Sequence, residues 1–324
     1  MSQNSLRTVP RTRLRPVLLG LLCLSALLAG PPPAPAAAGP STAGSPSGCA
    51  TMPRIAPGRT APQTLTSGGR QREYLLHIPA GYRPDRPSPV VLAFHGAGQS
   101  AELMESYSAL STLDALVLYP QGTTGTNGSA SWEGAPYSSG ADDVRFVGDL
   151  LERTRAWYCV DSKRVYATGK SNGGGFTALL ACRMPNRIAA FAPVAGAYYP
   201  QTAKDCDSAP AAPVLSFHGT ADTVIKYDGG TGHGTTYPSV PAWLAGWAEK
   251  DGCRVENGRG IGPDVTVSEW TDCSGGAEVT HYRVDGGGHT WPGAVERSGP
   301  GTTTRTVSAT AVMWEFFGRH PLGA

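Results

Sequence analysis

A serine flanked by glycines stands at Ser171, in the stretch GKSNGG at residues 169–174. The spacing G-x-S-x-G is typical of a sharp turn between a strand and a helix that exposes a nucleophilic serine hydroxyl. Glycine makes up 42 of the 324 residues, so this pattern also arises readily by chance. A nucleophilic role for Ser171 therefore requires a strand before it, a helix after it, and a base and an acid further along the chain.

The histidine that best suits the role of base is His289. It lies in the glycine-rich stretch DGGGHTW at residues 285–291, directly after the last expected strand. His281 lies inside that strand, and His320 follows the last expected helix. A loop at the carboxyl end of a strand can bring His289 to Ser171, where it would take the hydroxyl proton.

The acid that orients this base is predicted to be Asp222. It closes the stretch PVLSFHGTAD at residues 213–222, a few residues after an apolar strand. This gives the chain order serine, acid, histidine. Asp228 is the alternative, and either aspartate could instead serve only to form a turn.

Two backbone N–H groups are expected to bind the oxyanion that forms during attack on an ester or similar carbonyl. Asn172 supplies one at the start of a helix, and Ala97, in the HGAG stretch at 95–98, supplies the other. Residues 96–101 also fit the dinucleotide-binding pattern G-x-G-x-x-A. The next strand, however, ends in Tyr119-Pro120-Gln121, without the acidic residue that would hold a ribose.

The elements that must position these residues alternate along the chain. Strands are predicted at residues 73–78, 90–94, 115–119, 164–168, 189–194, 214–217, 265–270 and 279–284, and helices at 101–111, 142–158, 173–183, 240–249 and 307–318. Such alternation predicts an α/β fold with a mainly parallel central sheet covered by helices on both faces. Ligands bind such sheets at the carboxyl ends of the strands, where Ser171, Asp222 and His289 are expected to meet.

The amino-terminal residues 1–38 are predicted to be a signal peptide, with basic residues followed by an apolar run at 17–28 and the stretch AAA at 36–38. The apolar run is too short for a good membrane span, and the bulky Leu22 argues against lipid attachment at Cys23. Residues 39–48 form a Pro/Gly/Ser-rich flexible lead, and residues 49–324 a single catalytic domain. The protein is therefore expected to be secreted and extracellular, with a monomer favoured. A net charge of +2 with scattered signs gives no basic surface for nucleic acid.

Six cysteines remain after the signal peptide, an even number that indicates disulfides in an exported chain. A strand that rises and a helix that returns would bring Cys159 to Cys182. Cys253 and Cys273 bracket one loop-and-strand unit, which leaves Cys49 with Cys206. The cysteines lack the close C-x-x-C pairs of a zinc site, so no metal is expected.

These motifs in this order, together with the longer strings CVDSKRVYATGKSNGG and DDVRFVGDLL, resemble the secreted α/β-hydrolase esterases grouped with polyhydroxybutyrate depolymerases, feruloyl esterases and acetylxylan esterases. The resemblance covers the chain from about Cys49 to the last helix. It implies that Ser171, Asp222 and His289 form a catalytic triad. This triad would hydrolyse carboxylic esters through an acyl-enzyme, without a metal or an organic cofactor.

The resemblance and the Asn172 that follows the serine favour feruloyl or acetyl esters of plant polysaccharide as substrates. The alternatives are a polyhydroxybutyrate depolymerase and, from another class, a non-catalytic secreted protein that binds carbohydrate or matrix. Four aromatic residues are expected in loops near the site, where they would either stack on substrate or merely anchor the loops: Trp291, Trp132, Tyr137 and Tyr227. No role can be assigned to Lys170.

Overall fold

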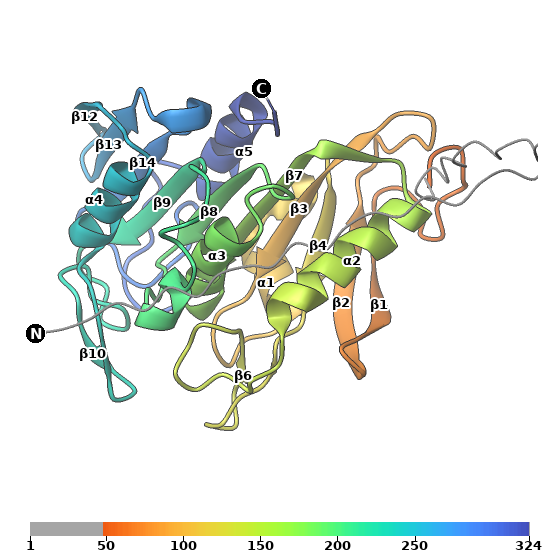
Figure 1. Ribbon diagram of the computed structural model, residues 1–324, viewed down its shortest axis with the longest axis horizontal. Coiled ribbons are helices and arrows are strands. Elements are labelled where there is room, and N and C mark those ends of the chain that lie inside the picture. Colours follow the sequence, from red (N-terminus) through yellow and green to blue (C-terminus); the bar gives the residue numbers. More distant parts are fainter. Residues whose placement is uncertain (1–47, 324) are drawn as a thin grey trace, which may run out of the picture. The chain divides into compact units, whose positions relative to one another are not determined.

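A computed structural model describes residues 48–323, so the expected signal peptide and all but the last residue of the lead lie outside the described residues. Within the described part, the main sheet has ten strands in the order β1-β2-β4-β3-β7-β8-β9-β14-β13-β12 (Figure 1). Their bounds are β1 Arg59–Ser67, β2 Arg70–Ile78, β4 Leu116–Pro120, β3 Ser88–Phe94, β7 Val160–Lys170, β8 Ala190–Val194, β9 Val214–Gly219, β14 Val279–Val284, β13 Val265–Thr271 and β12 Val255–Ile261.

The middle of the sheet is parallel. Strand β3 pairs in parallel with β4 and β7, and the parallel pairing continues through β8 and β9 to β14. Both flanks are antiparallel, because β2 pairs with β4 and β1, and β13 pairs with β14 and β12. Strands β4 and β8 are buried along their whole length, as expected for parallel strands covered on both faces.

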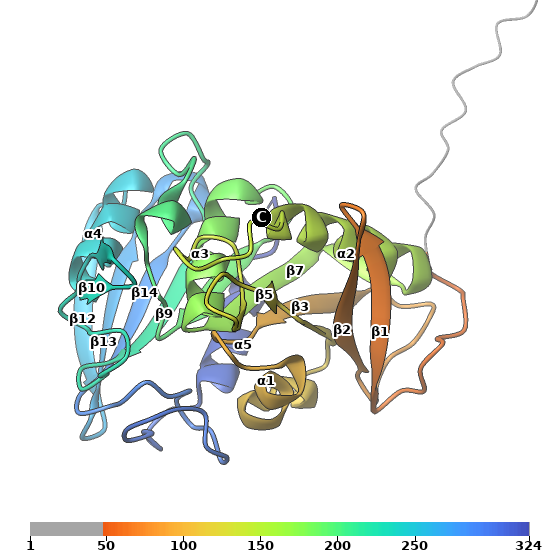
Figure 2. The same cartoon turned by 90° about the horizontal axis from the view of Figure 1, so that it is seen from below.

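Helices cover both faces of the sheet (Figure 2). The helices α2 Asp143–Trp157, α3 Asn172–Arg183 and α4 Val240–Lys250 pack on one face, and α1 Ala101–Ser108 and α5 Ala309–Arg319 pack on the other. Each face has its own apolar core: Phe146, Phe176 and Leu244 lie in one, and Met104 and Met313 in the other. This arrangement confirms the predicted α/β architecture.

The sequence pattern missed the two outermost strands. Strand β12 is exposed along nearly its whole length, so it carries no alternation of apolar and polar residues. Strand β1 is buried only near its end, at Leu65 and Ser67. The short hairpins β5 Thr123–Thr124 with β6 Ala130–Ser131, and β10 Gly230–Gly232 with β11 Thr235–Tyr237, were also missed. Among residues 48–323, no helix is both long and apolar enough to cross a membrane.

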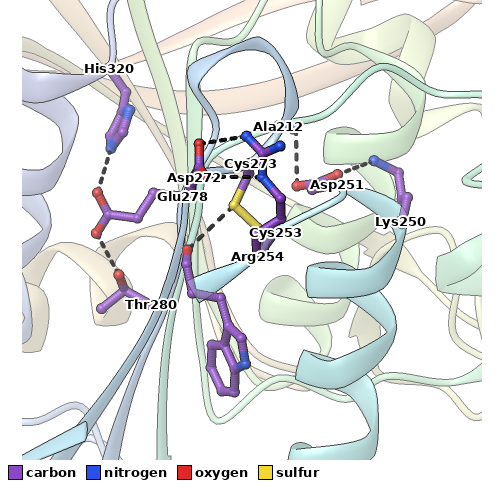
Figure 3. The surroundings of a disulfide bond; sticks show 11 residues. Ala212, Lys250, Asp251, Cys253, Arg254, Asp272, Cys273, Glu278, Thr280 and His320 are labelled. Carbon is purple, nitrogen blue, oxygen red and sulfur yellow. Dashed lines mark hydrogen bonds and ion pairs between the residues drawn. A yellow bond between two sulfur atoms is a disulfide. The ribbon is translucent and has the colours of Figure 1, made fainter. Parts of the chain in front are cut away.

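One predicted disulfide is confirmed. Cys253 and Cys273 are bonded, and they join the turn after α4 to the end of β13 (Figure 3). Two ion pairs flank this bond: Arg254 pairs with Asp272 at 2.9 Å, and Lys250 with Asp251 at 2.7 Å. The disulfide and the two ion pairs therefore lie together in the same part of the domain.

The other two predicted pairs are wrong. Cys49 is bonded to Cys159, and Cys182 to Cys206, instead of Cys159 to Cys182 and Cys49 to Cys206. The prediction assumed that α3 returns to the start of β7. Strand β7 has 11 residues and spans about 36 Å, whereas the 12 residues of α3 span about 18 Å. Cys182 in the last turn of α3 therefore stops short of Cys159 and meets the loop that carries Cys206.

The position of Cys49 is fixed by a backbone contact next to it. The N–H of Gly48 donates to the carbonyl of Arg155 at 2.8 Å, in the last turns of α2. This contact holds Cys49 beside the start of β7, where Cys159 precedes the strand.

Candidate active site

Ser171 lies at the turn between the end of β7 and the start of α3. Its backbone has φ 57° and ψ −120°, a conformation that costs energy for a residue with a side chain. Crowding explains the neighbouring glycines. A Cβ at Gly173 would lie 2.2 Å from the carbonyl oxygen of Phe94, and a Cβ at Gly169 would lie 2.4 Å from the carbonyl oxygen of Gly173. The strand, the turn and the helix required of a nucleophile elbow are all present.

The predicted base and acid are in contact. Nδ1 of His289 lies 2.7 Å from Oδ2 of Asp222, and both side chains are buried. The two residues come from the loops after β14 and β9, neighbouring parallel strands that end at the same edge of the sheet. Ser171 and His289 line one cavity of about 340 Å³, which we call the Ser171 cavity. The structure thus brings together all three residues of the predicted triad.

The carboxylate of Asp222 is held from two sides. Its Oδ1 accepts hydrogen bonds from the backbone N–H groups of Val224 (2.8 Å) and Ile225 (2.9 Å). Its Oδ2 faces His289 and also Nε2 of His218, which lies at 3.4 Å. Burial alone would raise the pKa of Asp222, but the hydrogen bonds from the two histidines outweigh burial and hold this pKa below its usual range. Asp222 is therefore ionised and accepts a hydrogen bond from the Nδ1–H of His289.

His289 is neutral over most of the pH range. Its burial, reinforced by the nearby charge of Lys170, lowers its pKa to about 4, although the hydrogen bond to Asp222 acts in the opposite direction. Because the proton of neutral His289 is held on Nδ1 by the hydrogen bond to Asp222, the lone pair of Nε2 is free to accept another proton. This is the tautomer that a general base requires.

Both expected oxyanion donors are near Ser171, since Asn172 follows it directly and Ala97 lines the same cavity. Asn172 begins α3, and the first N–H groups of a helix have no partner within that helix. Ala97 lines the Ser171 cavity, and its N–H takes part in none of the backbone hydrogen bonds among residues 48–323. The side chain of Asn172 is engaged elsewhere, since its Oδ1 accepts from the backbone N–H of Trp132 at 2.8 Å.

His95 positions the loop that carries Ala97. Its Nε2 accepts a hydrogen bond from the N–H of Gly122 at 3.0 Å, so Nδ1 carries the proton and donates to the carbonyl of Gly96 at 2.8 Å. Burial lowers the pKa of His95 to about 4, so the imidazole stays neutral and keeps this pattern. Neither His95 nor His218 was assigned a role from the sequence, although each lies at the end of a strand and is followed by a glycine.

Three of the four expected aromatic residues do not face the Ser171 cavity. Trp132 is fully buried and donates from Nε1 to the carbonyl of His95, and Trp291 is buried on the other face of the sheet, where Nε1 donates to Thr310. Tyr227 instead contacts Nε2 of His281 at 3.2 Å. These three residues anchor the fold, which is the second of the two roles expected for them.

The fourth expected residue, Tyr137, does line the cavity, from the loop before α2. Three further residues with rings line it too: Tyr199 from the segment after β8, and His233 and Tyr237 from the hairpin β10–β11. The rings of Tyr137 and His233 are in contact, with centroids 4.5 Å apart and planes tilted by 59°. Because the hairpin was missing from the predicted elements, Tyr237 and His233 were not expected at the site. Among the described residues, no group of three or more His, Cys, Asp and Glu could hold a metal ion.

The fold and the site together define an α/β-hydrolase. The sheet is mainly parallel, a serine lies at a strand-to-helix turn, and an aspartate and a histidine lie in loops after two later strands. The family model described as Esterase PHB depolymerase matches residues 72–254, and the chain belongs to this family.

Several curated proteins are similar to the chain. Feruloyl esterase B of Piromyces equi is 32% identical over 67% of this chain, which spans only 42% of that protein's length. Feruloyl esterase D of Neurospora crassa is 29% identical over 92% of this chain and 95% of its own length. The putative esterase NocK of Nocardia uniformis subsp. tsuyamanensis is 31% identical over 94% of this chain and 98% of its own length.

Among solved structures, the acetyl xylan esterase from Aspergillus awamori matches with a TM-score of 0.56. It is 17% identical, and the match covers 80% of this chain and 99% of that one. At this identity the likeness supports the fold alone.

Proposed function

We propose that this protein is a secreted serine esterase that uses Ser171, Asp222 and His289 as a catalytic triad. The observation that carries the proposal is the 2.7 Å contact between His289 and Asp222 at the rim of a cavity that Ser171 also lines. The three cysteine pairs suit an extracellular protein, because disulfides persist in oxidising surroundings.

The reaction has two halves. In the first, Oγ of Ser171 attacks the ester carbonyl carbon while Nε2 of His289 takes the hydroxyl proton, and the N–H groups of Asn172 and Ala97 bind the oxyanion. The tetrahedral intermediate collapses when the alcohol leaves with the proton from His289. In the second half, His289 takes a proton from water, the hydroxide attacks the acyl-enzyme, and the acid leaves as Ser171 regains its proton. Asp222 stays ionised throughout and stabilises the imidazolium.

Feruloyl or acetyl esters of plant polysaccharide are the proposed substrates. The names of curated relatives, feruloyl esterases and a bifunctional acetylxylan esterase/xylanase, support this class. The tyrosines of the Ser171 cavity offer faces on which a phenolic acyl group or a sugar would stack. The second candidate is hydrolysis of short-chain polyhydroxyalkanoate, which the description of the family favours.

A side-by-side assay tests both candidates. Purified protein is offered methyl ferulate, acetylated xylan and amorphous polyhydroxybutyrate, with Ser171→Ala as the control. We expect turnover of at least one of the first two and none by the variant. Turnover of the polyester alone would favour the second candidate. No turnover by the wild type, or equal turnover by Ser171→Ala, would refute the proposed esterase.

A further inference from the structure

Lys170 is buried immediately before the candidate nucleophile. Only 2% of its surface is exposed, yet it lines the Ser171 cavity together with His289 and Gly299. Its Nζ lies close to Gly299, where an added Cβ would come within 3.1 Å of it. The ammonium group therefore belongs to the wall of the cavity next to the base.

This ammonium has no partner among the described residues. None of the hydrogen bonds or ion pairs of residues 48–323 involves Nζ of Lys170, and the carboxylate of Asp222 acts on it only from beyond ion-pair distance. A buried charge without a hydrogen bond is costly, and natural proteins rarely keep one without a use. Burial lowers the pKa of Lys170 to about 8, so the group still carries a proton at neutral pH.

The surroundings of Lys170 favour an anion. None of the residues that line the Ser171 cavity is acidic, and Lys170 is the only lysine or arginine among these described residues. Helix α3 begins directly after Ser171, so its unpaired N–H groups and the positive end of its dipole add to the same field. The cavity thus combines a built-in cation with a helix start and contains no compensating carboxylate.

We propose that the Ser171 cavity takes esters that carry a free carboxylate, which the ammonium of Lys170 binds while the ester carbonyl lies at Ser171. The inference rests on the proposed esterase function and narrows its substrate class. The carboxylate can belong to the acyl part, as in a half-ester of a dicarboxylic acid, or to the alcohol part, as in an ester of a hydroxy acid. Both place the same group beside Lys170, and the experiment separates them.

The test uses two pairs of esters whose members differ in charge. Monoethyl glutarate and diethyl glutarate carry the difference on the acyl part, and O-acetylglycolate and O-acetylglycolamide carry it on the alcohol part. We expect the wild type to prefer the charged member of at least one pair in kcat/KM by about tenfold or more at pH 6.5, as for a charge pair in a water-poor site.

Two variants assign the preference to Lys170. Lys170→Met removes the charge and keeps an apolar chain of similar length. In this variant the ratio of kcat/KM for the charged ester to kcat/KM for the neutral ester should fall to about one. Lys163→Met removes the same charge from an exposed position at the other end of β7 and should keep the preference. Equal kcat/KM for both members of both pairs in the wild type, or an equal loss for charged and neutral esters in Lys170→Met, would overturn the inference.

A binding measurement separates this inference from the proposed function. Calorimetry on Ser171→Ala should show tighter binding of the charged than of the neutral member of at least one pair, and the added Lys170→Met change should remove that difference. If no ester is turned over but this difference is present, the esterase proposal fails and the anion site stands. If neutral esters are turned over and the difference is absent, the esterase proposal stands and the anion site fails.

Discussion

Replacing Lys170 by methionine should make the protein more stable. The pKa of Lys170 is lowered from an ordinary 10.5 to about 8 by burial, with Asp222 acting in the opposite direction. A difference of one in pKa corresponds to about 1.4 kcal/mol, so holding the protonated form inside the fold costs about 3 kcal/mol. Methionine avoids this cost but leaves the space of the ammonium unfilled. We therefore expect Lys170→Met to gain about 1–3 kcal/mol in free energy of unfolding at pH 7.

The sign of this effect fixes its pH dependence. The folded state binds the Lys170 proton less tightly than the unfolded state, so the cost is fully present below pH 8 and disappears as the pH rises towards 10.5. The gain should be about 2 kcal/mol smaller at pH 9.5 than at pH 7. Urea denaturation of wild type, Lys170→Met and the exposed control Lys163→Met at pH 7 and pH 9.5 measures it. A Lys170→Met variant that is less stable than wild type at pH 7 would show that favourable contacts hold the ammonium, and would refute this reasoning.

Three further predictions concern the site. Burial and the charge of Lys170 lower the pKa of His289 to about 4, so kcat/KM for a neutral ester should stay level down to about pH 5 and fall through pH 4. Lys170→Met should move this fall to higher pH. A pH profile that is the same in wild type and Lys170→Met would contradict an effect of Lys170 on the pKa of His289. Asp222→Asn should lower kcat by about 10⁴-fold by favouring the wrong tautomer of His289, and a loss below tenfold would count against the triad. Gly173→Ala should lower the free energy of unfolding by more than about 3 kcal/mol or prevent folding, since its Cβ would lie 2.2 Å from the carbonyl oxygen of Phe94. If urea denaturation shows wild-type stability, the backbone at the turn can shift to make room for the Cβ, and the prediction is wrong.

Much of the site was predictable from sequence because it depends on local patterns. An apolar strand followed by a short loop fixes the edge at which the loop residue lies, and this was enough to bring Asp222 and His289 to Ser171. The G-x-S-x-G spacing also predicted a sharp turn at Ser171, and the near contacts of Gly169 and Gly173 show why this turn requires glycine.

The features that were predicted wrongly depend on the lengths of elements and the paths of loops, which local sequence patterns do not determine. Whether Cys159 meets Cys182 depends on the relative lengths of β7 and α3, and β7 begins four residues earlier than its apolar core indicates. Whether Trp291 faces the cavity or the core depends on how its loop folds back after His289, where the backbone N–H of Trp291 is held by Ser298. The burial of Lys170 was not predicted, because a lysine between a strand and a turn is ordinarily expected to be exposed.

The bond between Cys49 and Cys159 has a practical consequence for immobilising this protein. It fastens the first described residues to the start of β7, whereas Ser171 follows the end of that strand, about 36 Å away. A support or a carrier domain coupled at Gly48 would therefore pull on the end of the sheet opposite the Ser171 cavity. The mouth of the cavity would stay open to bulky polymeric substrates, and any mechanical load would be borne by a covalent cross-link and not by the loops that carry Asp222 and His289.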